Sequence, residues 1–367
     1  ARIEVSTSEA KALRHWIPAH LHLGADDVTC RIAVLEGGAI QPGESGLVQL
    51  VLDEAIGALR GDRLILRDQS ARRTIAGGVV IDPFSPKRGR AKPERLAHLG
   101  AMALPDADQA LAALLGHHAA GVDLRQFTTA WNLTDAEIAG LYAGAEFKLL
   151  KSAASVWGLA TDHWQTLTSA ILGVVDAAHA ETPNLLGPSE DDIARALPLR
   201  YDRDVLRAAL QALLSATELA RQGPIFHRPD HKAQPDDADL ALWLRVEPLL
   251  VAGGRRPPRV RELAETLAIE LAALESFLGR AALFGWIYKI AANRYYPPAA
   301  ARELAGLVEE LAAQSDDATI SATQYKDLSG IGRNVSINVL EFFNKIGFTQ
   351  RLGDKHRIIQ PLEDIFG

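Results

Sequence analysis

Cysteine and methionine are almost missing from this sequence, which has one of each among 367 residues. A single cysteine excludes an internal disulfide and a cysteine-rich metal site, and it fits a reducing compartment. Because Cys30 lies in the apolar run 28–35, we expect a buried thiol rather than a reactive one. The one methionine is Met102 and the chain starts at Ala1, so we expect a piece of a longer protein.

Long apolar runs are missing as well. No run approaches the ~20 residues needed to span a bilayer, and the first residues carry no basic segment followed by an apolar one. We therefore expect a cytoplasmic protein with no membrane partner.

Motifs that carry catalysis are also missing. The sequence has no G-x-x-x-x-G-K-[ST] phosphate loop, no G-x-G-x-x-G after a strand, no H-E-x-x-H and no G-x-S-x-G. His20 and His22 alternate on one strand face, but no third ligand lies near them, so we do not expect a metal site. His117 and His118 end a predicted helix, where histidine interacts favourably with the free carbonyl groups. The sequence predicts no active site and no cofactor in this chain.

Positive charge is in deficit, since 39 Lys and Arg face 46 Asp and Glu and give a net charge of −7. With no overall basic field, nucleic-acid binding requires a local patch. A hydrophobic fraction of 48% is that of a folded protein, and the length exceeds what one core supports. We therefore expect several domains.

The first 85 residues follow the two-residue alternation of β-strands. The candidate strands that share this pattern are residues 28–34, 47–52, 63–67 and 74–82. A Gly77-Gly78 pair in the last of them indicates a bulge or a bend. Short strands separated by turn signals predict an all-β barrel over residues 1–85. A proline-bearing basic segment follows, and we interpret residues 86–95 as a linker.

The rest of the chain repeats one pattern of helices followed by a β-hairpin. The candidate hairpins lie at residues 147–159, 218–227, 286–296 and 347–359. A spacing of roughly 60–70 residues suits three helices and a wing in each unit. We predict winged helices over residues 96–161, 162–234, 235–297 and 298–367. The predicted fold is therefore multidomain, with an all-β barrel followed by an elongated α+β array of four winged-helix domains.

The fourth unit carries the most specific pattern. Ser321 and Gln324 have the spacing of a capping box, and the turn Gly330-Ile331-Gly332-Arg333-Asn334 leads into the next helix. A helix N-terminus beside two glycines and a cation suits a phosphate backbone. Residues 324–360 hold six Lys or Arg against three Asp or Glu, and we expect Ser336, Asn338 and Lys345 on the solvent side with the cations. By contrast, the helices at 190–197 and 270–284, which we take to be the reading helices of the second and third units, are acidic or apolar.

With these residues set out, the chain resembles the C-terminal portion of the bacterial selenocysteine-specific elongation factors, the SelB family. The segments that carry the resemblance are His15-Trp16-Ile17-Pro18-Ala19-His20-Leu21-His22, Leu64-Ile65-Leu66-Arg67-Asp68, Lys87-Arg88-Gly89-Arg90, Gly330-Ile331-Gly332-Arg333, and Leu340-Glu341-Phe342-Phe343. The resemblance implies that the barrel corresponds to the third domain of that family, a barrel shared with elongation factor Tu. The second and third winged helices match the family in architecture only.

The resemblance also implies a function. The intact factor binds GTP with Mg²⁺ and selenocysteinyl-tRNA through N-terminal domains absent from this sequence, so we expect no GTPase activity in this chain. It works on the ribosome and grips an mRNA hairpin, the selenocysteine insertion element, through its last winged helix, so that an in-frame UGA is decoded as selenocysteine. We expect a monomer. The positions to which the resemblance assigns RNA contact are Arg333, Asn334, Arg351, Lys355 and Arg357, with Gln324, Tyr325, Lys326, Gly330 and Ile331 beside them.

Two other functions fit the same pattern. Winged helices commonly read a DNA duplex, so a DNA-binding regulator is one alternative. A structural arm that only spaces domains apart is the other, and it suits the first three winged helices best.

Overall fold

A computed structural model describes residues 1–144, 146–152 and 155–366. The chain divides into two compact units, residues 1–166 with 201–205, and residues 167–200 with 206–367. Among the described helices, none is long and apolar enough to cross a membrane.

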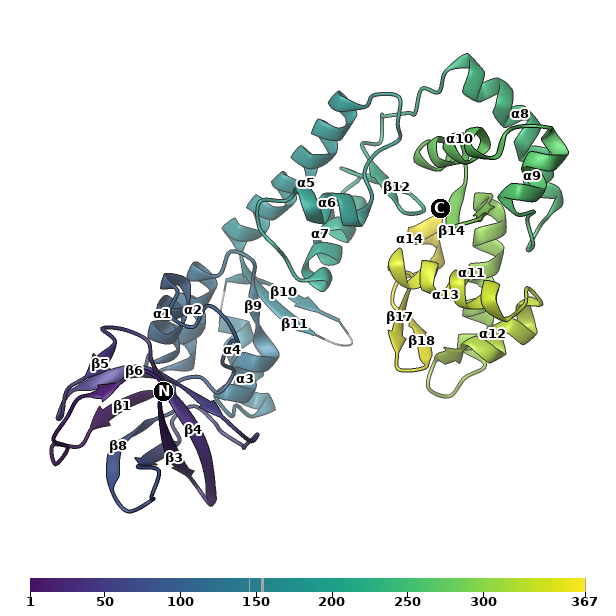
Figure 1. Cartoon of the computed structure of the whole chain (residues 1–367). Helices are drawn as coiled ribbons and strands as arrows, with labels where there is room; N and C mark the ends of the chain where they lie inside the picture. The colour runs from purple at the N-terminus through teal and green to yellow at the C-terminus, as the bar shows by residue number, and fades with distance from the viewer. Residues whose placement is uncertain (145, 153–154, 367) are drawn as a thin grey trace. The chain divides into compact units, whose positions relative to one another are not determined.

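The N-terminal barrel that the sequence predicts is present (Figure 1). Six strands close it in the order β1-β6-β4-β3-β7-β8. They are β1 (Arg2–Val5), β3 (Ile17–Leu23), β4 (Asp26–Val34), β6 (Ser45–Leu52), β7 (Arg63–Arg67) and β8 (Thr74–Val79), beside a small sheet of β2 (Leu13–Arg14) and β5 (Ala39–Ile40). Alternate residues fill the interior, and Cys30 is buried among them, as predicted. A Cβ on Gly78 would lie 2.2 Å from the carbonyl oxygen of Arg2, so this position in β8 requires glycine where the barrel closes onto β1.

The segment after the barrel is attached rather than loose. The helix α1 begins at Pro93, so the last three residues of the predicted linker are helical. Proline is favoured at the first helical position because the N–H it lacks would have no partner there. The Asp82 carboxylate accepts a hydrogen bond from Arg95 over 2.6 Å, and Gln49 donates to the carbonyl of Pro86.

Four winged-helix modules follow in the described part of the chain. The first consists of α1 (Pro93–Met102), α2 (Ala107–His117), β9 (Val122–Asp123), α3 (Leu124–Ala130), α4 (Asp135–Gly144), β10 (Phe147–Lys151) and β11 (Val156–Ala160). The second consists of α5 (Thr161–Glu181), α6 (Glu190–Ala196), α7 (Arg203–Ser215), β12 (Ala220–Gln222) and β13 (Ile225–His227). The third consists of α8 (Asp237–Ala252), α9 (Val260–Leu267), α10 (Leu271–Leu283), β14 (Tyr288–Ala291) and β15 (Arg294–Tyr296).

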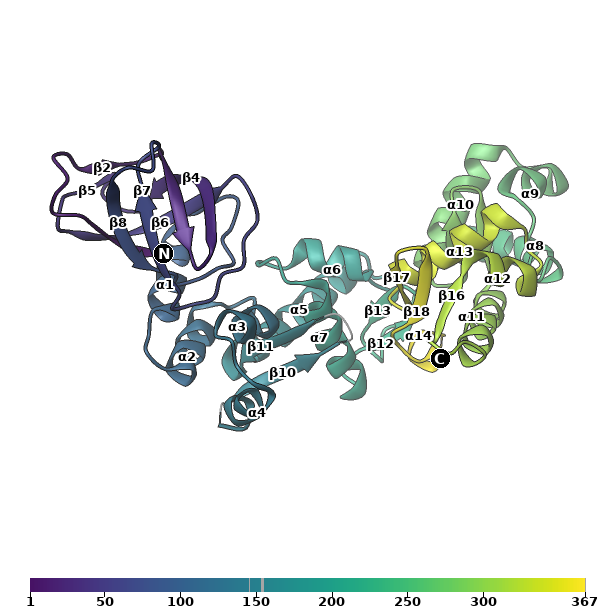
Figure 2. The ribbon, with the colours of Figure 1, turned by 90° about the horizontal axis from the view of Figure 1, so that it is seen from below.

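The fourth module consists of α11 (Pro298–Ala313), β16 (Thr319–Ser321), α12 (Ala322–Ser329), α13 (Arg333–Lys345), β17 (Thr349–Leu352), β18 (Lys355–Ile358) and α14 (Leu362–Phe366). All four hairpins lie where the sequence predicts them. A third strand, which the sequence did not reveal, joins the hairpin in the first and fourth modules. Figure 2 shows β16, β18 and β17 side by side in the fourth.

One helix assignment in the second module was wrong. The residues 190–197 form the middle helix α6, whereas α7 precedes the hairpin and therefore holds the reading position. Arg207 of α7 pairs with Glu190 of α6 over 3.0 Å, and both side chains are largely buried. The reading helix of this module is thus partly used in packing against its neighbour.

The second, third and fourth modules contact one another inside the second unit. The guanidinium of Arg221, on β12, donates to the carbonyl of Ile346 and to Gln360, and burial lowers the pKa of Arg221 to about 10. The ring of Tyr288, on β14, lies 6.0 Å from that of Phe342 on α13. These contacts attach the fourth module to the second and third modules.

Candidate nucleic-acid interface

The turn between α12 and α13 depends on two glycines in left-handed conformations. Gly330 has φ 68° and caps α12 through its N–H, which donates to Lys326 O over 3.0 Å; Gly332 has φ 85°. Ile331 between them is only 4% exposed and anchors the turn to the core. The two exposed glycines therefore present a bare backbone on either side of a buried anchor.

The N-terminus of α13 opens at this turn. No side chain caps it within the described residues, and the first helical hydrogen bond runs from Ser336 N to Gly332 O. The preceding N–H groups have no partner inside the helix, and they carry the positive end of its dipole. Arg333 and Asn334 are exposed at the first two positions. The arrangement favours an anionic ligand.

The wing supplies three further cations. Arg351 is exposed, and its Nε donates to Gly353 O over 2.9 Å, which folds the side chain along the wing turn. Arg357 is half-buried on β18, opposite Thr319 of β16 and Gln350 of β17. Lys355 is exposed and lies 2.8 Å from the Asp317 carboxylate.

Asp317 was not foreseen from the sequence. Its carboxylate accepts hydrogen bonds from Lys355, Thr319 and Ser315, and these hold the pKa of the carboxyl well below its usual range. Asp317 stays ionised, so it offsets the charge of Lys355. Among the described contacts of the wing cations, Lys355 is the one held in an ion pair with a carboxylate of the same module.

A buried polar network attaches the wing to α13. The ring Nδ1 of His356 lies 3.0 Å from the amide nitrogen of Asn344, and Thr349 donates to the Asn344 carbonyl oxygen over 2.8 Å. Burial, and then the nearby charge of Arg351, lower the pKa of His356. The contacts between the His356 ring and the Asn344 amide group fix the wing against the end of α13.

Three residues that the sequence placed on the contact surface lie in the core instead. Tyr325 is 0% exposed and donates its hydroxyl to Leu304 O over 3.0 Å, and burial raises its pKa. Ile331 is buried as described above. Ser336 is 0% exposed and donates to Gly332 O. We correct these assignments, because a side chain without exposed surface has nothing to offer to RNA.

The weaker candidates on α12 have local partners. The Gln324 carbonyl oxygen accepts from the backbone and hydroxyl of Ser321, which completes the predicted capping box and leaves the amide NH₂ outward. Lys326 lies 2.8 Å from its neighbour Asp327. Arg333 therefore combines exposure with the helix N-terminus better than any other predicted cation.

Comparison with known proteins places these features in a family. The family model described as the beta-barrel domain of the selenocysteine-specific elongation factor matches residues 1–87, and the model described as the winged helix of elongation factor SelB matches residues 312–358. The selenocysteine-specific elongation factor of Escherichia coli (strain K12) is 31% identical over an alignment of 368 positions, which covers 98% of this chain and 56% of that protein. The Haemophilus influenzae factor is 25% identical over 97% of this chain and 56% of its own length.

This chain belongs to the SelB family. It spans about half the length of the curated SelB relatives that it matches. A solved structure described as the mRNA-binding domain of elongation factor SelB from E. coli in complex with SECIS RNA is 32% identical. The match covers 34% of this chain and the whole chain of that structure, with a TM-score of 0.32. The SelB winged-helix match contains α12, α13 and the wing, which are the elements described above.

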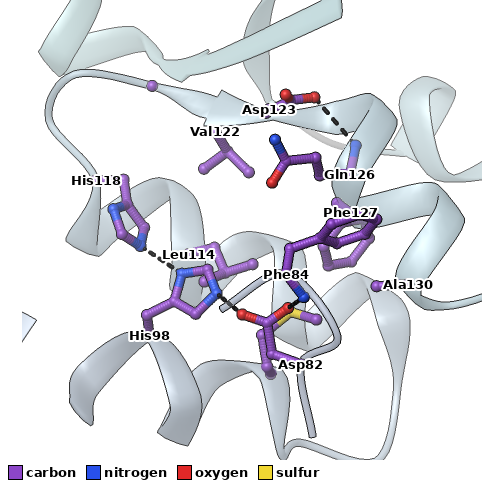
Figure 3. A pocket seen from close by; sticks show the side chains of 12 residues that line it. Asp82, Phe84, His98, Leu114, His118, Val122, Asp123, Gln126, Phe127 and Ala130 are labelled. Atoms are coloured by element: carbon purple, nitrogen blue, oxygen red, sulfur yellow. Dashed lines mark hydrogen bonds and ion pairs between the residues drawn. The ribbon is translucent and has the colours of Figure 1, made fainter. Parts of the chain in front are cut away.

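A second polar cluster lies in the first unit of this SelB chain, at the joint between the barrel and the first winged helix (Figure 3). His98 contacts the Asp82 carboxylate through Nε2 over 3.1 Å and His118 through Nδ1 over 2.9 Å, beside a cavity of about 110 Å³. Burial, and then the charge of His98, lower the pKa of His118 to about 4. Burial alone would raise the pKa of Asp82. The hydrogen bond from His98 and the charge of Arg95 outweigh burial, so the pKa of Asp82 lies below its usual value.

This cluster is a structural joint. The Asp82 carboxylate also accepts from the backbone N–H of Phe84, so its oxygens are fully used. The described residues contain no group of three side chains placed to hold a metal. His117 and His118 do end α2, as predicted from the sequence, but the role of His118 is to connect α2 to the barrel through His98.

Proposed function

We propose that this chain binds an mRNA hairpin of the selenocysteine insertion type through the N-terminus of α13 and the wing of the fourth winged helix. The observation that carries the proposal is the uncapped, glycine-flanked N-terminus of α13, with exposed Arg333 and Asn334, inside the segment that matches the SelB winged helix. Hairpin loops are read through splayed bases and phosphate contacts, which few well-placed cations can supply.

The whole protein to which the chain belongs is, in this proposal, a cytoplasmic GTPase that uses GTP and Mg²⁺ and delivers selenocysteinyl-tRNA to an in-frame UGA on the ribosome. Its relatives named selenocysteine-specific elongation factors support this. The proposal assigns nucleotide chemistry to segments beyond this sequence, because the sequence carries no phosphate-loop motif. This chain then contributes RNA recognition.

Equilibrium binding to matched nucleic acids tests the proposal. The probes are an RNA hairpin from a selenocysteine-encoding message of the source genome, the same hairpin with a scrambled loop, and a DNA duplex of equal length. Fluorescence anisotropy at one salt concentration should give about tenfold or more tighter binding to the natural hairpin than to either control. Equal affinity for the three would reject hairpin recognition, and a preference for the duplex would favour a DNA-binding regulator.

A further inference from the structure

An exposed tryptophan in a strained turn lies on the first unit, between β2 and β3. Trp16 has φ 71°, in the left-handed region that bulky residues rarely adopt, and 42% of its surface is exposed. Its N–H donates to Ile32 O over 2.7 Å, which holds the turn against β4. The backbone is thus strained to keep an indole ring at the surface, where the ring adds little to the barrel core.

Two polar side chains flank this indole. The Arg90 guanidinium carbon lies 5.3 Å from the centroid of the Trp16 ring, within cation–π range. The His15 ring lies 5.9 Å away on the same turn, with 25° between the planes. The residues come from different segments, the turn before β3 and the chain that follows the barrel.

Further cations lie on the same segment as Arg90. Lys87, Arg88 and Lys92 are all exposed on the segment that carries Arg90. Arg95 does not contribute, because its side chain is largely buried against Asp82. The segment is ordered by a turn at Gly89, with φ 73°, and by the hydrogen bond from Gln49 to Pro86 O. The exposed cations therefore lie on an ordered segment, and Arg90 of that segment lies beside the indole.

We propose that Trp16, Arg90, Lys87 and Arg88 form a second RNA-binding surface, which contacts phosphates through the cations and stacks an unpaired base on the indole. Exposed aromatic rings within a basic patch are the common means by which proteins bind single-stranded nucleic acid. A purely electrostatic surface would not require an aromatic side chain held in a strained turn. This surface lies outside the segment that matches the SelB winged helix and does not depend on the hairpin site.

The test uses the full chain with Arg333→Ala and Arg357→Ala, so that the hairpin site contributes little. Its probes are fluorescein-labelled U12 and a 12-base-pair RNA duplex, followed by anisotropy at several KCl concentrations. Adding Lys87→Ser and Arg88→Ser should weaken U12 binding about tenfold and reduce the slope of log affinity against log salt by about 1.4. The charge-matched control Arg261→Ser with Arg302→Ser, two exposed arginines of the second unit, should change neither quantity.

The aromatic contribution is tested separately. Trp16→Leu should weaken U12 binding about tenfold while leaving duplex binding unchanged, and Trp16→Phe should restore most of it. Equal losses with the control pair, or unchanged U12 binding in the Lys87 and Arg88 variant, would overturn the proposal. The Lys87, Arg88 and Trp16 substitutions, made instead in a chain that keeps Arg333 and Arg357, should bind the mRNA hairpin as the parent chain does, so failure here is distinguishable from failure of the hairpin proposal.

Discussion

The Lys355 ammonium nitrogen lies 2.8 Å from the Asp317 carboxylate, joining β18 to the turn before β16. Both side chains are about half exposed, so the pair adds little stability by itself. Its effect is on the surface charge, because Asp317 offsets a cation at the edge of the proposed RNA surface. If the wing binds RNA as proposed, the pair moderates its affinity.

Replacing Asp317 with Asn should strengthen hairpin binding about two- to fivefold, because Lys355 becomes free for phosphate. The salt dependence should steepen by about one phosphate contact. The measurement is an anisotropy titration at several salt concentrations. The Asp316→Asn variant removes the same charge one residue away, and an equal gain in both variants would show a general field effect instead.

Removing the amide beneath the wing should destabilise the fourth module. Asn344→Leu takes away the partner of His356 and Thr349 and leaves buried polar groups unpaired, at a cost of about 1–3 kcal/mol. Urea unfolding monitored by circular dichroism measures the loss. Asn338→Leu, on the same helix and half-buried, is the control and should cost less; equal losses would mean that the network contributes nothing specific.

Acidification should loosen the joint between the barrel and the first winged helix. The pKa of His118 is about 4 in the folded protein against 6.5 in an unfolded chain, so the unfolded state binds more protons between these values. The contribution of neutral His118 to the free energy of unfolding is therefore complete above pH 6.5. It is lost as the pH falls towards 4, by up to about 2 kcal/mol after solvent screening. Unfolding free energies of the parent chain and His118→Gln at pH 7.5 and 5 should converge at the lower pH. A constant difference would contradict the assignment.

Arg60 is a second link at the same joint. Its Nε donates to Met102 O over 2.7 Å, and its guanidinium lies 3.6 Å from the centroid of the Trp131 ring. Arg60→Ala should cost about 2–4 kcal/mol and expose the first winged helix to proteolysis, because a partly buried hydrogen-bonding and stacking group is lost. Arg60→Lys should restore little, since a lysine lacks the planar fork. Full rescue by lysine would show that charge alone matters.

The periodic features were predictable from the sequence. The strand at 63–67 was placed to the residue because a short apolar run lies there between two arginines and a turn signal precedes it. The capping box at Ser321 was also recognisable, since it depends on residues three apart. Patterns among neighbouring residues were sufficient to predict a barrel and the positions of the four hairpins.

Features that depend on tertiary contacts were not predictable in the same way. Tyr325 lies on an eight-residue helix, too short for its buried stripe to be separated from its exposed face. Asp317 reaches Lys355 across 38 positions, and a two-residue strand such as β9 carries no periodicity. In the second module the prediction took residues 190–197 as the reading helix, although α7, which directly precedes the hairpin along the chain, holds that position.

The most direct test of the central claim is the hairpin affinity of Arg333→Ala. Arg333 lies at the uncapped start of α13, so its loss should weaken hairpin binding by about 1–3 kcal/mol, roughly fivefold to 150-fold, without changing the unfolding midpoint. Arg261→Ala, an exposed arginine on α9, should bind as the parent does. Unchanged affinity of Arg333→Ala for the hairpin, with the fold intact, would contradict the account.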